Sequence, residues 1–497
     1  MAAMTELHEL TALELAAAYR AADTTPTEVV DHLLGRVAAY SDAVGAFVTV
    51  TADSARRTAA AAGRLLRADP EGTAPLLGVP TGIKDLNATA GVRTTFGSTV
   101  TADTVPRVSD ELVLRLERAG LISLGKTNTP EFGSPCYTEP DTAPPARTPY
   151  DLGRSAGGSS GGAAAAVAAG LLPVAQGSDG GGSIRIPASV CALVGLKPSR
   201  GRVSAAPLYG DVSGLSVAGP LATTVRDAAA MLNSLAGPAV GDPSWAAPLP
   251  AGETFLTHCD HAPARLRIAR FATPPIAAGP VHPEALAAYE TTADLLDRLG
   301  HLVEEIDLAV PDPTVALFET VWSVGAASWP VAADREAELR PLSRWLRARG
   351  RMVSGPEFAQ ALVGMRQAAA AVLVSLASYD AVLTPTLAQP PAPIGALRND
   401  DDPAGDFEAQ KRFTPFTALW NVTGMPAVSL PVHWTTDQLP VGVMLAGRPG
   451  ADAALLRLAA QVEAASTVAG RWPHPATPFT AAWPTTDVAS TELTGSV

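Results

Sequence analysis

The spacing of apolar and polar positions predicts helices at the start of the chain. Thr11 with Glu14, and Thr25 with Glu28, each fit the S/T-x-x-E pattern of a capping box. Pro26 then stands at the first position of the second helix, where proline is favoured.

Further along, helical periodicity is repeatedly followed by a short apolar run. Ser109 is the expected cap of a helix that ends at Gly120, and residues 121–124 predict a buried strand. A second helix is expected over 285–299, followed by extended chain. Two more buried strands are expected over 379–384 and 425–432. This alternation indicates an α/β fold, a sheet covered by helices.

Three segments depart from this pattern. Residues 237–274 are rich in Ala, Pro and Gly and are expected to form a surface connection. Residues 400–406 are predicted to form an acidic loop, and the polar tail, about 485–497, is expected to be frayed.

Composition narrows the class of protein. Of the 497 residues 47% are hydrophobic and only 17% charged, which is the reverse of a disordered chain. The net charge of −13 argues against nucleic-acid or anionic-membrane partners, since both require basic surfaces.

The compartment is predicted to be cytoplasmic. Three cysteines, Cys136, Cys191 and Cys259, are too few and too far apart for a disulfide framework. No signal-peptide pattern opens the chain, and the longest run of low polarity, 163–172, is too short to cross a bilayer.

The most unusual segment, 153–202, holds serines within two glycine clusters. Ser159 and Ser160 lie in the first cluster, and Ser183 follows Gly180, Gly181 and Gly182 in the second. Glycines expose backbone N–H groups, so the second cluster can aim several of them at one oxyanion.

Two other motifs fit this chemistry less well. The segment 78–84 lacks the residue order of a phosphate-binding loop. Residues 157–161 satisfy G-x-S-x-G, the nucleophile elbow of α/β-hydrolases, but the preceding residues 150–154 are not a buried strand. None of the eight histidines lies in a setting that resembles a site. An elbow esterase remains an alternative.

The glycine-serine segment closely resembles that of the amidase signature enzymes. The segments GVPTGIKD (78–85), GKTNTPEF (125–132), NVTGMPA (421–427) and LPVGV (439–443) extend the resemblance from about residue 8 to about residue 465. The resemblance implies one large α/β domain, 1–497, with a mixed central sheet covered on both faces by helices. Its signature core would span about 75–205 and its C-terminal half about 275–470.

The resemblance also implies a catalytic triad. Ser183 would be the nucleophile, Ser159, after a cis peptide bond, the proton relay, and Lys84 the base and then the acid. A neutral lysine can act so only when it is desolvated. The amides of Gly180, Gly181, Gly182 and Ser183 would bind the oxyanion. From composition alone, Ser160 is an equal candidate for the relay.

Neighbouring residues are expected to have supporting roles. Three residues, Ser160, Asp179 and Arg185, are predicted to support the nucleophile loop, which is the segment 180–183 that ends at Ser183. Lys126, the competitor of Lys84, is expected to be structural and Cys191 to lie in the core. No metal or cofactor is expected, because His258 and His261 lack an accompanying ligand motif.

The pocket departs from the family pattern. Residues 142–149 lack the usual asparagine, Gln438 stands where glycine is usual, and Met444 where glutamine is common. The segment 310–370 is predicted to build an apolar outer pocket wall, suited to aryl or aliphatic acyl groups. Its large aromatic residues are Phe318, Trp322, Trp329 and Trp345.

The resulting hypothesis is a serine amidohydrolase, a monomer or homodimer, that cleaves small amides or anilides, with carbamates and esters as further substrates. The glutaminase subunit of a tRNA-dependent amidotransferase is an alternative, against which the acidic charge and the altered pocket weigh. A non-catalytic binding module on the same fold is a second alternative.

Overall fold

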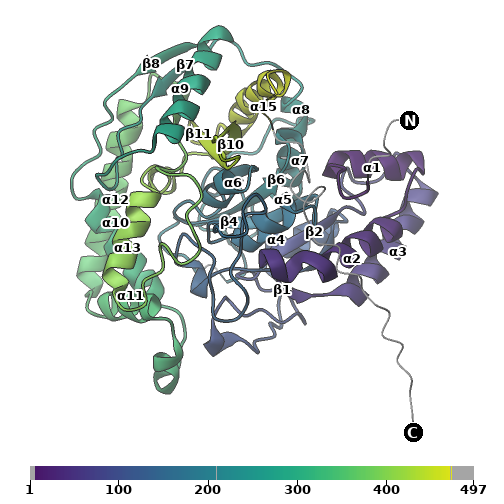
Figure 1. Ribbon diagram of the computed structural model, residues 1–497, viewed down its shortest axis with the longest axis horizontal. Helices are drawn as coiled ribbons and strands as arrows, with labels where there is room; N and C mark the ends of the chain where they lie inside the picture. The colour runs from purple at the N-terminus through teal and green to yellow at the C-terminus, as the bar shows by residue number, and fades with distance from the viewer. Residues whose placement is uncertain (1–5, 209, 471, 473–497) are drawn as a thin grey trace.

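Two β-sheets organise the computed structural model, which describes residues 6–208, 210–470 and 472 (Figure 1). The smaller sheet has the order β1-β3-β2, and the larger is a mixed sheet of order β4-β6-β5-β10-β11-β9-β7-β8. The strands are β1 (Phe47–Val50), β2 (Pro80–Lys84), β3 (Ile122–Thr127), β4 (Val174–Asp179), β5 (Val194–Lys197), β6 (Val217–Ala222), β7 (Arg267–Arg270), β8 (Leu302–Glu305), β9 (Ala381–Pro385), β10 (Ala427–Trp434) and β11 (Pro440–Gly447).

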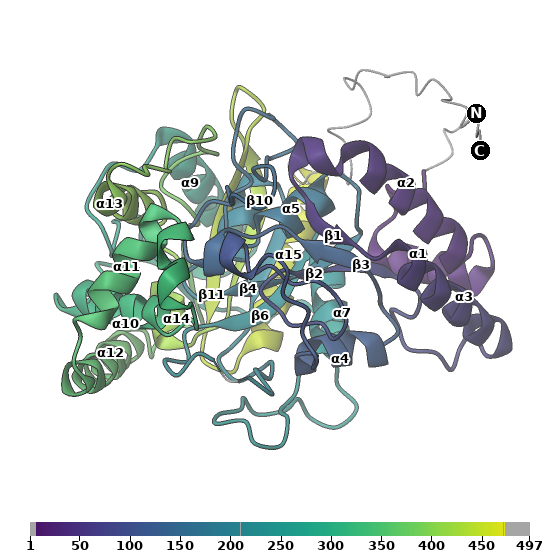
Figure 2. The ribbon, with the colours of Figure 1, turned by 90° about the horizontal axis from the view of Figure 1, so that it is seen from below.

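Helices flank these sheets. In both ribbon views α1–α3 lie at one end of the molecule and α10–α13 at the other (Figures 1 and 2). The helices are α1 (Ala12–Ala21), α2 (Pro26–Val44), α3 (Ala52–Ala68), α4 (Glu111–Arg118), α5 (Gly161–Ala168), α6 (Arg185–Val190), α7 (Val225–Leu235), α8 (Phe255–His258), α9 (Pro283–Arg298), α10 (Thr314–Ala327), α11 (Pro341–Arg351), α12 (Gly355–Ser375), α13 (Pro403–Phe413), α14 (Leu419–Thr423) and α15 (Asp452–Val468).

Strand β11 shows that both faces of the large sheet are covered. Its side chains alternate between faces, as the pleat of a strand requires. Val443 and Leu445 belong to the main core, which also contains buried residues of α9 and α15. Met444 and Ala446 pack instead with Trp420 of α14. The predicted α/β fold, with a mixed central sheet between helices, is therefore confirmed.

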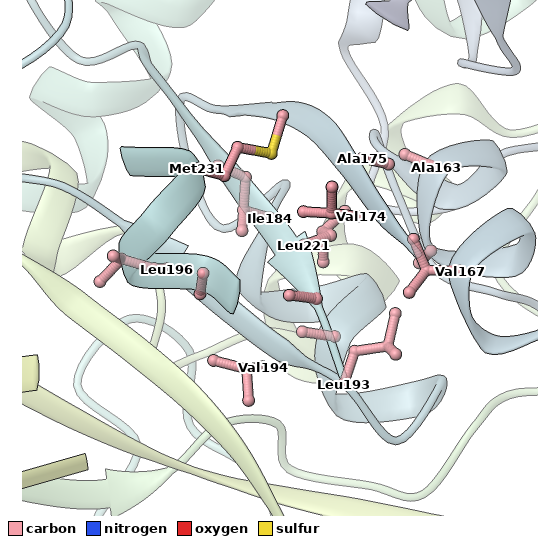
Figure 3. Close-up of a cluster of buried hydrophobic side chains, with 14 of the residues drawn as sticks. Ala163, Val167, Val174, Ala175, Ile184, Leu193, Val194, Leu196, Leu221 and Met231 are labelled. Atoms are coloured by element: carbon pink, nitrogen blue, oxygen red, sulfur yellow. The ribbon is translucent and has the colours of Figure 1, made fainter. Parts of the chain in front are cut away.

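Helix α5 is buried along its whole length, which small residues make possible. Helix α5 packs against β4, and its Ala163 and Val167 belong to one buried apolar cluster with Val174 and Ala175 of that strand (Figure 3). A Cβ at Gly162 would lie 2.3 Å from the backbone nitrogen of Asn128. This close packing fixes the start of α5 beside the end of β3, and Ser160, just ahead of the helix, is hydrogen-bonded to Ser178 of β4.

Most expected elements are present. Both capping boxes form, at Thr11 and Thr25. Helix α9 and strands β9 and β10 lie within two residues of their predicted bounds. The tail, 485–497, lies outside the described residues.

Three expectations are wrong. Asp110 is the N-cap of α4, while Ser109 accepts a hydrogen bond from the amide of Ala90. The stretch 237–274 is only partly a connection, because it contains α8 and β7, and β7 is a strand of the large sheet. Asp406 belongs to α13, where its buried carboxylate accepts hydrogen bonds from Tyr137 and Gln410.

Helix α12 has the length and apolar composition that could cross a membrane, by those two measures alone. A core helix passes the same test, so this is weak evidence. Here α12 packs against α10 and α14, and buries Ala361, Met365 and Val372.

The pairing of α10 with α11 yields a test of the fold. A Cβ at Gly350 of α11 would lie 2.0 Å from the carbonyl oxygen of Ser323 in α10. Gly350→Ala should therefore lower the free energy of unfolding by about 1–3 kcal/mol. Gly325→Ala is the matched control, since its Cβ would meet nothing within 4 Å. It should be neutral or stabilising by about 0.5–1 kcal/mol. Urea denaturation of both variants measures the difference, and equal effects would contradict the packing described.

Candidate active site

Lys84 lies at the end of β2 and is completely buried. Every residue of this strand is buried, and the strand runs parallel to β3 in the small sheet. The Nζ atom donates hydrogen bonds to Ser159 Oγ at 2.7 Å and to Ser178 Oγ at 3.0 Å. The backbone amide of Lys84 donates to Gln176 Oε1 at 2.9 Å, which fixes the strand end.

Burial sets the charge of this lysine. Loss of solvation lowers the pKa of Lys84 to about 7, although the negative charge of Asp179 partly opposes the shift. The ordinary value is 10.5. Near neutral pH a large fraction of Lys84 is therefore neutral and able to accept a proton from Ser159.

Ser159 follows a cis peptide bond with Gly158. Its carbonyl oxygen accepts a hydrogen bond from Thr129 Oγ1 at 2.9 Å. Two glycines allow other segments to lie close to Ser159. A Cβ at Gly133 would lie 3.3 Å from Ser159 Oγ. A Cβ at Gly158 would lie 2.8 Å from the carbonyl carbon of Tyr137. The Ser159 hydroxyl is thus enclosed between Lys84 and the chain at Gly133.

Ser160 has different partners. Its hydroxyl donates to the carbonyl oxygen of Ser178 and accepts from the amide of the same residue, both at 3.2 Å. Its own amide donates to the carbonyl oxygen of Ser183 at 3.1 Å. The hydroxyl of Ser160 therefore holds β4 and its amide holds the nucleophile loop, whereas Ser159 contacts Lys84. This contrast favours Ser159 as the relay.

The loop 180–183 joins β4 to α6. The carbonyl of Gly181 accepts a hydrogen bond from Thr417 Oγ1 at 2.6 Å, and the amide of Gly182 donates to Asp179 Oδ1 at 2.8 Å. The expectation that Gly182 helps to bind an oxyanion is thus not supported, because its N–H is already engaged. Gly180, Gly181 and Ser183 remain as candidate donors.

A buried ion pair holds this loop. Arg185 donates to both carboxylate oxygens of Asp179, at 2.8 and 2.9 Å, and both side chains are fully buried. Asn421 donates to Asp179 Oδ1 and accepts from Arg185. Burial alone would raise the pKa of the Asp179 carboxyl, but Arg185 holds that pKa well below its usual range. Both residues thus support the loop by contact.

An apolar cavity that is open to solvent lies beside Ser183. Phe318 and Trp322 of α10 line it, as predicted for the pocket wall. Trp329 and Trp345 do not line it: Trp329 stacks on Phe132, and Trp345 packs against Phe407. The cavity is lined by Ser134, Pro135, Cys136, Gly181, Ser183, Ile186, Pro275, Ile276, Val310, Thr314, Val315, Phe318, Glu319, Trp322, Phe407, Gln410, Lys411, Thr414, Ala418, Leu419 and Val422.

The remaining candidates lie outside the site. Lys126 is buried and donates to the carbonyl oxygen of Asn87 and to Thr94 Oγ1. Cys191 is fully buried in the core. His258 contacts Glu253 and Arg457. Among the described residues, no group of three or more His, Cys, Asp or Glu side chains is arranged to hold a metal ion.

Sequence reasoning missed four contacts of the site. Gln176 and Ser178 hold Lys84, and Thr417 and Asn421 hold the nucleophile loop. Gln176 and Ser178 occupy the strand that leads into the glycine cluster, and Asn421 opens a segment that resembles the family. Position alone gave them no role, since a side chain's partner depends on the folded chain.

Comparison with known proteins agrees with this geometry. The sequence matches the amidase family over residues 28–456. An acylamidase of Rhodococcus erythropolis is 34% identical over 476 residues, which cover 95% of this chain and 98% of that protein.

Solved structures give the same result. The 6-aminohexanoate cyclic dimer hydrolase superimposes with a TM-score of 0.85 at 32% identity, covering 95% of this chain and 99% of the other. A bacterial aryl acylamidase of the amidase signature family gives a TM-score of 0.83 at 27% identity, with the same two coverages. This chain therefore belongs to the amidase signature family and is a hydrolase that acts on amide C–N bonds.

The Asp179–Arg185 pair yields a test of the site. Asp179→Asn removes the charge that compensates a fully buried guanidinium. The substitution should lower the free energy of unfolding by about 3–5 kcal/mol. The matched control is Asp151→Asn, which breaks the half-exposed pair with Arg154 and should change stability by less than about 1 kcal/mol. Denaturation monitored by tryptophan fluorescence compares the two, and a small effect of Asp179→Asn would contradict the support role.

Proposed function

We propose that this enzyme hydrolyses small uncharged amides and anilides through an acyl-enzyme on Ser183, with Ser159 as relay and Lys84 as general base. The observation that carries the proposal is the 2.7 Å hydrogen bond from Lys84 Nζ to Ser159 Oγ. It joins a fully buried lysine to a serine beside the nucleophile loop.

The reaction begins with attack of Ser183 Oγ on the substrate carbonyl carbon. The hydroxyl proton of Ser183 passes to Ser159 as the proton of Ser159 passes to Lys84 Nζ, so one proton is gained by the lysine. The amides of Gly180 and Gly181 stabilise the oxyanion. When the C–N bond breaks, the proton returns through Ser159 to the leaving nitrogen. Water then cleaves the acyl ester by the same steps in reverse.

The charges that line the cavity favour the binding of uncharged substrates. Its charged lining residues, Glu319 and Lys411, are paired with each other, so neither is free to receive a charged substrate. The likeness to an acylamidase and an aryl acylamidase agrees with amides and anilides. Carbamates and esters are further proposed substrates, because they form the same kind of acyl intermediate on serine.

The glutaminase alternative fits the cavity less well. Glutamine carries a carboxylate and an ammonium group, and burying either without a partner is unfavourable. The purified chain should therefore turn over simple amides but not glutamine. The reverse result would favour the amidotransferase alternative.

The role of Ser183 can be tested by substitution. Ser183→Ala should abolish hydrolysis of a 4-nitroanilide and labelling by a fluorophosphonate, because the variant lacks the hydroxyl that forms the acyl-enzyme. Ser54→Ala is the control, since Ser54 is exposed on α3 and should leave the rate unchanged. Mass spectrometry of the labelled wild-type peptide locates the label. A label on Ser159 or Ser160, or full activity of Ser183→Ala, would contradict the proposal.

The pH dependence tests Lys84. Because only neutral lysine accepts a proton, kcat/KM should fall about tenfold per pH unit below the pKa of about 7 and level off above it. Circular dichroism at each pH controls for unfolding. A rate that stays constant from pH 8 to pH 5, with the fold intact, would exclude Lys84 as the base.

A further inference from the structure

Two aromatic side chains of α10 cover the glycine loop of the site. Phe318 and Trp322 lie one helical turn apart, and their rings stack with centroids 5.3 Å apart and planes 18° apart. A Cβ at Gly180 would lie 3.5 Å from the Trp322 ring, and one at Gly181 would lie 3.7 Å from Phe318. One carbon atom added to either glycine would reach contact distance from a ring, so the two rings lie close over the loop that would bind the oxyanion.

The other groups of the site define how a bound substrate would be oriented. A tetrahedral intermediate has four substituents: Ser183 Oγ, the oxyanion, the leaving nitrogen and the acyl carbon. The leaving nitrogen must face Ser159, which returns the proton and lies against Gly133. The oxyanion faces Gly180 and Gly181. The acyl carbon takes the remaining direction, and the rings that lie over the oxyanion loop are within its reach.

The aromatic pair is held in place. Trp322 Nε1 donates a hydrogen bond to Ser134 Oγ at 3.2 Å. Both rings pack against a small core that contains Leu215, Val321 and Val422. They remain only partly buried and line the cavity with Ser183, so apolar ring surface is left for a ligand.

From this geometry we propose that Phe318 and Trp322 select the acyl part of the substrate, with a preference for planar aryl or unbranched alkyl acyl groups. Ser134 acts as a positioning residue that orients Trp322. The leaving amine lies on the side of Gly133 and is selected less strictly. The inference rests on the proposed acyl-enzyme at Ser183 and names the acyl class that this site takes.

Flat apolar groups suit such a surface for physical reasons. Stacking on an aromatic ring adds to the burial of apolar area, and both terms are lost when the ring is removed. An acetyl group is too small to gain much from either ring. Loss of a ring should therefore affect long or aryl acyl groups and spare acetyl.

The test measures kcat/KM for acetyl, hexanoyl and phenylacetyl 4-nitroanilides, which share one leaving group. A second series keeps the phenylacetyl group and varies the aniline. Phe318→Ala and Trp322→Ala should each reduce the preference for phenylacetyl over acetyl about tenfold or more, and leave the order of the anilines unchanged. Trp245→Ala is the control, an exposed tryptophan that does not line the cavity. It should preserve the acyl preference.

Ser134 has its own pair of variants. Ser134→Ala should reduce the acyl preference in part, because the Trp322 indole loses its acceptor, and Ser134→Thr should restore it. The conservative variants Phe318→Leu and Trp322→Phe keep the core filled if the alanine variants unfold. Each should then lower the phenylacetyl preference severalfold.

Labelling of Ser183 by a small fluorophosphonate separates this proposal from the one it rests on. Normal labelling with a lost acyl preference supports the acyl surface. Normal labelling with a preference that is unchanged, or with a changed order of anilines instead, would overturn it. Failure of the wild-type enzyme to label at Ser183 would overturn the proposed function itself.

Discussion

The desolvation of Lys84 is the constraint on which the site depends. A buried ammonium group without a charged partner in contact is unfavourable, so the protein lowers the pKa of the lysine instead of leaving it charged. The surrounding structure supplies neutral acceptors, the hydroxyls of Ser159 and Ser178. The negative charge that opposes the shift, that of Asp179, is engaged by Arg185. Burial of β2 therefore gives Lys84 the neutral form that the proposed base requires.

A second buried lysine shows how the same burial can serve structure. Lys126 lies on the neighbouring strand, and burial lowers its pKa to about 8, with Asp85 and Asp110 opposing the shift. Its Nζ atom binds a backbone carbonyl and a threonine, and Asp85 lies 3.8 Å away. These partners include no serine of the site. The two lysines differ in partners more than in burial, and this difference supports the separate roles proposed for them.

Local pattern predicted the elements whose signals are contained within a few residues. The capping boxes at Thr11 and Thr25 are such cases, because cap and partner lie in the same turn. The prediction for Ser109 was wrong because its hydroxyl is taken by the amide of Ala90, a contact with a distant segment. The loop expected over 400–406 was wrong at Asp406 for a local reason. Asp402 caps α13 and Pro403 begins it, so Asp406 lies in the first turns of that helix.

The resemblance to a family predicted most residues of the candidate site, and the structure showed which partners each of them has. Composition left Ser159 and Ser160 equivalent, and the pairing of Ser160 with β4 separates them. The hydrogen bond from the Gly182 amide to Asp179 could not be predicted from the sequence either, because a glycine cluster does not show where each N–H points. The sequence predicted Phe318 and Trp322 in the pocket wall, but the acyl surface proposed for them depends on the position of α10 over the glycine loop, which no local pattern encodes.

Direct titration of Lys84 tests the central claim most closely. NMR of isotope-labelled lysine side chains, with the Lys84 signal assigned by its loss in Lys84→Arg, measures the protonation of Nζ itself. The account predicts a pKa of about 7 for this group, against the ordinary 10.5. A pKa near 10.5 would mean that Lys84 is charged at every working pH, and it would contradict the account.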